Sequence, residues 1–577
     1  MLRVAAWVSA SVAAALLVWA PAFRSLQATG FGDWQQFHHA WEAGWVALWR
    51  FGEWPLWDPF HCGGITIFGN PQSQVFSPFY FLSFLGGPTV GTKLFLVVHA
   101  AAGFGGMFLF ARRELGVGIP AALVASAAWA GSGFFAWRGA GGHAAFLPFY
   151  FTPLVLFAWR RAAEDLRWAA GVALLLALVL CEGGVYPFPF FVLLCAFDAL
   201  VRLVRPPANV RRGGIVVAAF VAAPLTALCG AIRLLPIVDE LRRHPRTMPS
   251  YDSITLGEAL EMLTTRRHDW HFGTHQFVWP EYCAFVGWGV VLLGACGILL
   301  ACARRRGSIA LGFLLFGGLM LGDHFWGAPW ALLHRLPIYD SLRVPSRFAV
   351  FFTFYLALAA ALALDTLAAW LARAGLARGS RGWGAALSLA PYAIALGLVI
   401  DLCAANYAIV DRWKRPPVAH GPVAARHHLS DLAYGRWYAS FPRLNVGSRR
   451  CYEAMTFKVP KGLWTGDKAQ ARIEARPGAA RPRGEVRDWG RTTSTAWAEV
   501  MLEGPARVVF NQGFAPGWTS SVGVAQRDPK GRLVVDAPTG KHHIRLVYRP
   551  PTLWWALGLS AAGLIAAVGV ARFGKSA

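Results

Sequence analysis

Apolar residues occur along this chain in windows of roughly twenty, separated by short polar or basic stretches. A helix of that length crosses the hydrocarbon core of a bilayer, so the pattern predicts a polytopic α-helical membrane protein with about twelve transmembrane helices. They are expected near residues 4–22, 91–111, 118–137, 145–160, 168–182, 186–204, 213–235, 283–303, 308–321, 347–372, 383–405 and 553–572. The composition agrees with this class, because 56% of the residues are hydrophobic and only 15% are charged.

Basic residues gather in the loops on one side of this arrangement. If the N-terminus is cytoplasmic, every short inside loop carries arginine, as in Arg112-Arg113 and Arg160-Arg161. This agrees with the positive-inside rule and predicts an even number of helices, with both termini in the cytoplasm. The segment from Met1 to Ala22 also fits a secretory signal with a small-residue cleavage site. In either case the following loop lies outside.

The formal net charge of +24 raises the question of nucleic acid binding. Topology accounts for many of these charges, so no nucleic-acid partner is expected. The remaining excess lies outside the membrane, where it suits anionic lipid or a phosphate-bearing substrate.

Three regions follow from the pattern. Residues 1–405 form a transmembrane domain whose long first extracytoplasmic loop covers 24–90. Residues 406–551 form an extracytoplasmic (periplasmic) domain, and residues 552–577 are a last helix with a short cytoplasmic tail. Short strand-like segments separated by Gly- and Pro-containing turns predict a small β sandwich of jelly-roll or immunoglobulin type. These segments are 497–502, 506–510, 532–535 and 543–548.

The first loop is dense in motifs between Gly32 and Pro78, and a connection of this length is more often functional than a spacer. Residues 33–50 fit a helix lying flat at the interface. Its aromatic residues recur at three- and four-residue steps, a stripe suited to lipid headgroups. They are Trp34, Phe37, Trp41, Trp45 and Trp49. The acidic residues Glu42 and Glu53 are expected to be solvated.

Asp33 is the leading catalytic candidate. It follows a flexible Gly30-Phe31-Gly32 entry and lies close to the outer membrane surface. A carboxylate there can accept a proton from an acceptor hydroxyl, or it can ligate a divalent cation such as Mg²⁺ or Mn²⁺. The alternative is that Asp33 only caps the helix that it begins.

Other polar side chains are candidates for substrate binding. Arg343 and Arg347 bracket Pro345 and can clamp a lipid-linked phosphate, or they can be snorkelling anchors. Arg138 and His143 flank a glycine turn that allows close approach of a ligand. The remaining candidates are Trp34 and Trp57 as walls of a sugar pocket, Asp58 as a polar group or an Asx turn, and Glu182 at a costly membrane depth.

Nine cysteines are present, most of them inside predicted helices. Cys62 and Cys451 lie on the oxidising side, where a disulfide between them can form. The chain has no Cys-x-x-Cys or zinc-type spacing.

Several motifs together resemble the bacterial YfhO-like membrane proteins. The first loop carries Asp33-Trp34-Gln35-Gln36-Phe37, Trp54-Pro55-Leu56-Trp57-Asp58-Pro59, Gly63-Gly64 and Asn70-Pro71-Gln72. Further along come Arg343-Val344-Pro345-Ser346-Arg347, Phe514-Ala515-Pro516-Gly517-Trp518, Gly540 and Tyr548-Arg549-Pro550. The resemblance spans nearly the whole chain, and it implies a multi-pass protein of the bacterial plasma (inner) membrane.

That family looks like the GT-C-type glycosyltransferases, which take a sugar from a polyprenyl-phosphate donor on the outer face. The resemblance implies that Asp33 is catalytic and that the acceptor is a cell-envelope glycan or glycolipid. Position 35 is Gln, so the loop lacks an Asp-x-Asp pair, and metal dependence stays open. A transporter or flippase of lipid-linked sugars, with Asp365 and Asp401 as intramembrane groups, and a non-catalytic envelope assembly protein are the alternatives.

Overall fold

The computed structural model describes residues 2–574 except 251, 270, 304–305, 378–380, 415–420, 433–437, 454–456 and 477–482. Within these residues, eight helical segments are long and apolar enough to cross a bilayer. They are α1 (Leu2–Trp19), α3 (Gly87–Phe110), α4 with α5 (Ile119–Ala130 and Gly133–Gly141), α8 (Pro187–Val204), α9 (Arg212–Cys229), α16 (Ala349–Ala377), α17 (Arg381–Val410) and α19 (Leu553–Phe573). The chain is therefore a multi-pass helical membrane protein.

The other four predicted crossings are also helical. Three are single helices of 15 or 16 residues, and the fourth is divided between a 3₁₀ helix and an α-helix. They are η4 with α6 (Ala144–Phe151 and Thr152–Ala162), α7 (Arg167–Cys181), α13 (Trp288–Ala303) and α14 (Gly307–Leu321). Proline and glycine shorten two of them: Pro148 lies within η4, and Gly183-Gly184 follows α7. Short helices lie between the long ones: α10 (Ala231–Arg243), α11 (Leu256–Thr264), α12 (Trp279–Tyr282) and α15 (Pro329–Leu333), with the short turns η1 (Ala20–Phe23), η3 (Ala111–Leu115), η5 (Tyr339–Ser341) and η6 (Pro345–Phe348).

Helix α16 lies at the centre of the bundle and is apolar on all sides, as expected of a buried helix. Two glycines of α13 let its backbone approach α16 closely. A Cβ at Gly297 would lie 1.8 Å from the Ala359 carbonyl oxygen, and one at Gly294 would lie 2.2 Å from the Leu356 side chain. Small residues at helix contacts provide this close packing in membranes, where the hydrophobic effect between helices is weak.

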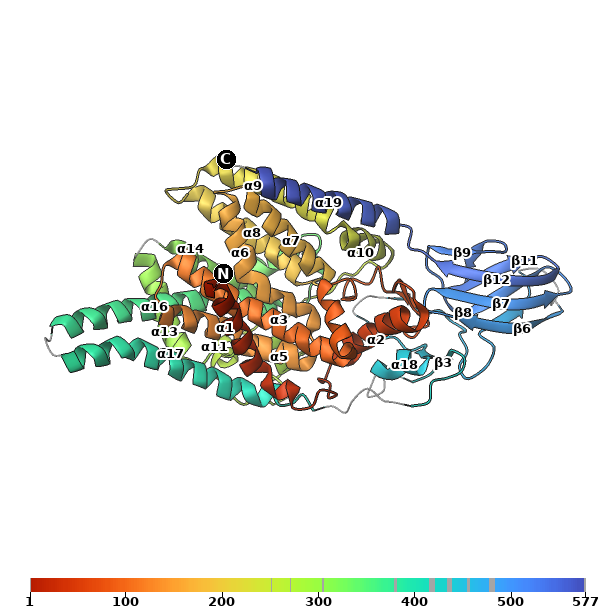
Figure 1. Cartoon of the computed structure of the whole chain (residues 1–577), viewed down its shortest axis with the longest axis horizontal. Helices are drawn as coiled ribbons and strands as arrows, with labels where there is room; N and C mark the ends of the chain where they lie inside the picture. Colours follow the sequence, from red (N-terminus) through yellow and green to blue (C-terminus); the bar gives the residue numbers. More distant parts are fainter. Residues whose placement is uncertain are drawn as a thin grey trace.

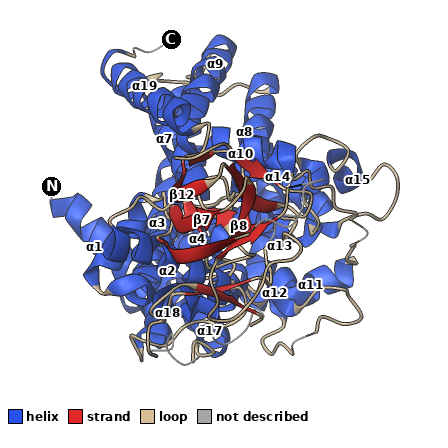
Figure 2. Ribbon diagram, turned by 90° about the vertical axis from the view of Figure 1, so that its right-hand side faces the viewer, coloured by secondary structure: helices blue, strands red, loops and turns tan. Residues whose placement is uncertain are grey.

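The C-terminal region before α19 is a β sandwich, which confirms the predicted β-rich fold. Two antiparallel four-stranded sheets have the orders β10-β11-β8-β5 and β6-β7-β12-β9. Their strands are β5 (Ala471–Glu474), β6 (Gly484–Arg491), β7 (Thr495–Leu502), β8 (Ala506–Gly513), β9 (Trp518–Ser520), β10 (Ala525–Arg527), β11 (Arg532–Ala537) and β12 (Gly540–Tyr548). Buried side chains from both sheets, such as Val500, Val508 and Leu546, share one core. The sheets lie at one end of the molecule, with the helical bundle behind them (Figures 1 and 2).

The first loop lies between the bundle and the sandwich (Figure 1). It contains α2 (Trp34–Phe51), a small hairpin of β1 (Trp57–Asp58) and β2 (Ile65–Thr66), and the 3₁₀ helix η2 (Pro78–Leu85). The helix predicted over 33–50 is confirmed. The interfacial placement of its aromatic stripe is wrong for Trp34, Phe37 and Trp41, which are buried in the protein. Trp49 remains 63% exposed at the end of the helix.

The segment after α17 packs onto α2, although more than 380 residues separate them in sequence. It contains β3 (His428–Ser430), η7 (Tyr438–Ser440), α18 (Phe441–Leu444) and β4 (Val446–Ser448). Arg443 pairs with Glu42, which is fully buried rather than solvated. Glu53 accepts hydrogen bonds from Thr492 and Thr493 of the sandwich, so it too differs from the expectation.

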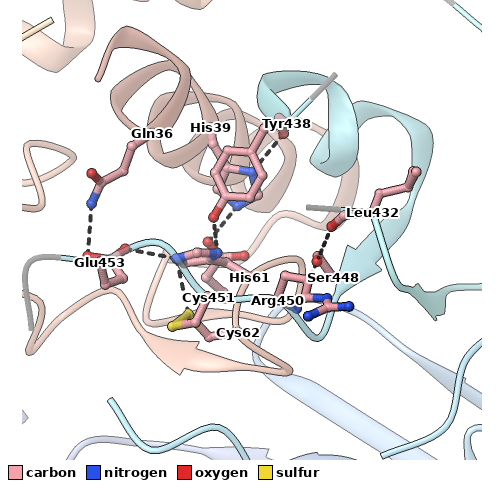
Figure 3. The surroundings of a disulfide bond; sticks show 11 residues. Gln36, His39, His61, Cys62, Leu432, Tyr438, Ser448, Arg450, Cys451 and Glu453 are labelled. Atoms are coloured by element: carbon pink, nitrogen blue, oxygen red, sulfur yellow. Dashed lines mark hydrogen bonds and ion pairs between the residues drawn. A yellow bond between two sulfur atoms is a disulfide. The ribbon is translucent and has the colours of Figure 1, made fainter. Parts of the chain in front are cut away.

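A disulfide joins the first loop to this segment. The Cα atoms of Cys62 and Cys451 lie 4.4 Å apart, and the predicted bond is present. Around it, Glu453 accepts a hydrogen bond from Gln36 of α2 and pairs with His61 at 3.1 Å (Figure 3). The disulfide therefore fixes the position of residues 451–453 against the start of α2.

We expect the Cys62→Ser/Cys451→Ser double variant to be less stable than the wild type by about 2–4 kcal/mol, because the bond closes a very long loop. Thermal unfolding of the purified protein measures this loss of stability. The control is Cys296→Ser, which replaces an exposed cysteine that forms no disulfide. Alkylation of the unfolded chain checks the bond directly. The seven cysteines that are free in the structure should react with the alkylating reagent before reduction. The two cysteines of the disulfide should react only after reduction. Equal labelling before and after reduction would contradict the disulfide.

Candidate functional site

Asp33 lies where the first loop meets the C-terminal end of α5. Its backbone N–H donates to the carbonyl oxygen of Gly141 at 3.0 Å, which ties the start of α2 to the turn after α5. Gly142 makes this approach possible. It has a φ of +86°, and a Cβ there would lie 2.0 Å from the backbone nitrogen of Trp34. The glycine turn thus serves the close packing of two backbone segments.

The carboxylate of Asp33 makes no capping hydrogen bond to α2, so the capping alternative is wrong. One oxygen accepts a hydrogen bond from the Tyr452 hydroxyl at 2.8 Å. The other lies 3.7 Å from Nε2 of His143, and 34% of the Asp33 side chain is exposed. Asp33 is therefore held by a partner from the distant 451–453 segment and remains accessible to a ligand.

His143 is oriented from behind by a buried arginine. Arg138 donates to Nδ1 of His143 at 2.9 Å, which places the proton of the neutral imidazole on Nε2, facing Asp33. Burial lowers the pKa of His143, and the nearby arginines lower it further against the opposing effect of Glu281 and Asp33. His143 is consequently neutral at pH 7 and presents an N–H donor beside the carboxylate.

Glu281 of α12 is the buried anion that holds two of the candidate arginines. Arg138 donates to its Oε2 at 2.8 Å, and Arg347 donates to the same oxygen at 3.0 Å. Burial alone would raise the pKa of Glu281, but Arg347 and Arg138 hold it well below its usual range. Arg347 also lies over the Tyr186 ring at 4.3 Å. The guanidinium of Arg347 is thus largely committed to the protein.

Arg343 and Arg347 differ in their ion pairs, since Arg347 pairs with Glu281 and Arg343 pairs with no described carboxylate. The guanidinium of Arg343 lies over the Phe277 ring at 5.4 Å, and its Nε is buried with no hydrogen-bond partner among the described residues. Nη1 of Arg347 also lacks a hydrogen-bond partner among them. Burial and Asp33 raise the pKa of the Tyr452 hydroxyl. Arg343 lies close enough to Tyr452 to oppose this rise in part.

Arg246 lies near Arg343, Arg347 and Tyr186. Burial lowers its pKa, and the positive charges of Arg343 and Arg347 lower it further, while Tyr186 opposes them. Three arginines from two distant loops therefore lie close together, and the buried carboxylate of Glu281 pairs with one of them, Arg347. An anionic group is the natural ligand of such a cluster.

An apolar groove of about 410 Å³ is formed by α8, α14 and α15. Its walls are almost entirely aliphatic: Leu193, Leu315, Leu319, Gly327, Pro329, Leu332, Leu333 and Leu336. The chain runs from α15 directly to Arg343, and Tyr339 on the way donates to the carbonyl oxygen of Pro189 at the start of α8. One loop therefore contributes both to the apolar groove and to the arginine cluster.

The structure brings together Asp33, Arg138, His143, Arg343 and Arg347 from the sequence-predicted set. It adds Tyr452, Arg246 and Glu281, which sequence reasoning missed. Glu281 follows a Trp-Pro pair at the membrane boundary, and Arg246 lies in a basic run, so composition alone did not distinguish them.

The other predicted site residues lie elsewhere. Trp34 is fully buried and donates to the Gly139 carbonyl oxygen at 2.6 Å. Trp57 packs against Trp518 and Tyr548 of the sandwich.

Two predicted carboxylates are also held inside the protein. Asp58 accepts from the Phe60 N–H at 2.8 Å, which is the Asx turn, and pairs with His39 at 2.9 Å. Glu182 is fully buried against His99 at 2.6 Å.

A divalent cation at Asp33 would need further side chains nearby that can act as metal ligands. Among the described residues, Asp33 belongs to no group of three close His, Cys, Asp or Glu ligands. The group that exists, His61 with Cys62 and Cys451, has its two sulfur atoms bonded to each other. The described residues around Asp33 therefore do not form a metal site with several ligands.

No family model matches the chain and no curated protein matches it, so the YfhO-like resemblance stays a prediction. Among solved structures, the chain is similar to the arabinofuranosyltransferase AftD from Mycobacteria, with a TM-score of 0.49 and 14% sequence identity. The match covers 79% of this chain and 32% of that one, so this chain spans about a third of its length. A likeness of this extent does not say what this chain binds or does.

We expect Glu281→Gln to destabilise the protein by about 3–5 kcal/mol, because two buried arginines lose their counter-charge. The matched control is Glu485→Gln, which removes a local pair with Arg487 at an exposed site and should cost less than about 1 kcal/mol. Thermal unfolding in nanodiscs measures both variants. Equal stability of the two would contradict the central position of Glu281.

Proposed function

We propose that this protein is a membrane glycosyltransferase of GT-C type. It moves a sugar from a polyprenyl-phosphate-linked donor to a hydroxyl group of an extracytoplasmic cell-envelope glycan or glycolipid. The observation that carries the proposal is the exposed Asp33 carboxylate, whose partner Tyr452 lies near Arg343, together with the apolar groove bordered by the loop that carries Arg343.

Asp33 has the position required of a general base. It accepts the proton of the acceptor hydroxyl, and the acceptor oxygen forms a bond to C1 of the donor sugar. The bond between C1 and the phosphate oxygen breaks, and polyprenyl phosphate leaves with the electron pair. The hydroxyl of Tyr452 orients the carboxylate, and the Nε2–H of His143 is available to a sugar hydroxyl.

The arginines have a matching task. Negative charge develops on the phosphate as the bond breaks, and fixed cations in a partly dry site stabilise it. Arg343 is the best placed of them, because Arg347 is bound to Glu281. Arg347 and Arg138 then position the site rather than contact the phosphate.

The groove of α8, α14 and α15 supports a lipid-linked donor. An isoprenoid chain is aliphatic and fits an aliphatic groove, while its phosphate needs cations nearby. The β sandwich would bind the acceptor or cover the site. A requirement for Mg²⁺ or Mn²⁺ stays a prediction.

The transporter alternative relied on Asp365 and Asp401. Asp365 accepts a hydrogen bond from the backbone N–H of Gly118 at 2.7 Å, and Asp401 pairs with Arg266. Neither contact favours transport over transfer.

We expect Asp33→Asn to lower the rate of polyprenyl-phosphate release by about 10²–10⁴-fold, because the amide cannot accept the proton. The assay uses purified protein in nanodiscs with a panel of polyprenyl-phosphate sugars and envelope extract as the acceptor. Tyr452→Phe should retain the carboxylate and lose only part of the rate. If Asp33→Asn released polyprenyl phosphate at the wild-type rate, Asp33 would have no part in the mechanism. If neither the wild type nor Asp33→Asn released it, although both bound the donor, the result would favour transport or assembly.

We expect Arg343→Ala to weaken donor binding by about tenfold or more, which corresponds to the loss of one charge-assisted contact. Arg335→Ala is the matched control. Arg335 lies in the same loop, but it is exposed and packs over Trp326. Binding of a polyprenyl-phosphate sugar to each variant is measured in nanodiscs. Equal affinities of the two variants would show that Arg343 does not hold the phosphate.

A further inference from the structure

A second cavity, of about 260 Å³, lies between the first loop, the end of α10 and the β sandwich. It shares no lining residue with the Asp33 site. The first loop contributes Trp57 and the β1–β2 hairpin, α10 contributes Glu240 and Arg243, and the sandwich contributes the Phe514-Ala515-Pro516 segment and Arg527. Residues 457–460, which follow the disulfide, form the remaining side.

The walls of this cavity combine aromatic rings with polar groups. Trp57, Phe457 and Phe514 line it, and Phe457 lies 5.2 Å from the ring of His244. Aromatic rings accept the apolar C–H faces of a sugar ring, while a few placed polar groups fix its orientation. Its volume lies just below the usual range of about 300–1,000 Å³ for ligand pockets, which suits a single sugar ring.

Glu240 supplies a buried hydrogen-bond acceptor. Its Oε1 accepts from Arg243 at 2.8 Å, and its Oε2 lies 3.7 Å from His244, which is beyond hydrogen-bond distance. One lone-pair region of the carboxylate therefore remains for a ligand hydroxyl. Arg243 is itself neutralised, since it also pairs with Asp239.

The cavity is also lined by two cations that, unlike Arg243, are not neutralised by an ion pair with a described residue. Lys458 and Arg527 are exposed, and neither has an ion-pair partner within the described part of the chain. They come from separate segments, one after the disulfide and one on β10, and both border the same opening. Uncompensated cations at the mouth of an aromatic pocket select a ligand that carries negative charge.

We propose that this cavity is a second carbohydrate-binding site, which takes an acidic sugar unit, either a uronate or a sugar phosphate, of an extracytoplasmic glycan. The aromatic walls hold the ring, Glu240 accepts a hydroxyl hydrogen bond, and Lys458 with Arg527 hold the anionic substituent. The inference goes beyond the proposed transfer reaction and does not depend on it, because its readout is equilibrium binding.

Binding of four probes to the full-length protein in nanodiscs tests the site: glucuronate, glucose 6-phosphate, glucose and inorganic phosphate. Isothermal titration calorimetry should show that the two acidic sugars bind at least tenfold more tightly than glucose or phosphate alone. The Lys458→Ala/Arg527→Ala double variant should lose at least tenfold in affinity for the acidic sugars. The control is Lys541→Ala/Arg545→Ala, which removes two exposed cations of β12 that do not line the cavity, and it should bind like the wild type.

Three results would overturn the proposal. Unchanged affinity in the Lys458/Arg527 variant would show that these two cations do not hold the ligand. Phosphate binding as tightly as glucose 6-phosphate would reduce the site to a patch for small anions. Loss of binding in Asp33→Asn would place the sugar in the other site, whereas unchanged binding there supports a separate one.

Discussion

The attachment of residues 438–453 to the first loop is the constraint on which the candidate site depends. Neither segment forms a core by itself, since the first loop has one long helix and the other segment has only short elements. The disulfide between Cys62 and Cys451 and the buried pair of Glu42 with Arg443 hold them together. Tyr452 follows the bonded cysteine directly and reaches Asp33 for this reason.

A second constraint acts from the membrane side. Glu281 is a buried carboxylate between two arginines, and each arginine leads to another part of the site. Arg138 orients His143, and Arg347 fixes the loop that carries Arg343. A buried charge network of this kind costs desolvation, and it is retained where it specifies one arrangement. Here that arrangement holds the exposed carboxylate of Asp33 next to His143 and fixes the loop that carries Arg343.

Much of the fold was predictable from local patterns. The apolar windows located every long helix, and the strand-like segments located β7, β8, β11 and β12. The helix over 33–50 was also predicted, but its burial was not, because an aromatic stripe looks the same whether it faces lipid or another part of the protein. The covering segment lies about 400 residues further along the chain, and local patterning carries no information about it.

The candidate site shows the same division. Asp33 and Arg343 stood out because they lie at membrane boundaries, whereas Tyr452 and Arg246 acquire their roles only through tertiary packing. Arg233 is a further example. It is buried and donates to the carbonyl oxygens of Phe68, Asn70 and Ser73, so it holds the Asn70-Pro71-Gln72 motif in place. That motif is thus explained by backbone anchoring, a reason that its own residues do not reveal.

The most direct test of the central claim is an experimental structure of the protein in nanodiscs with a polyprenyl-phosphate sugar bound. The account predicts that the lipid chain lies along the groove of α8, α14 and α15. The phosphate should lie beside Arg343, and C1 of the sugar should face the region of Asp33 and His143. A headgroup bound away from Asp33, or a lipid chain outside that groove, would contradict it.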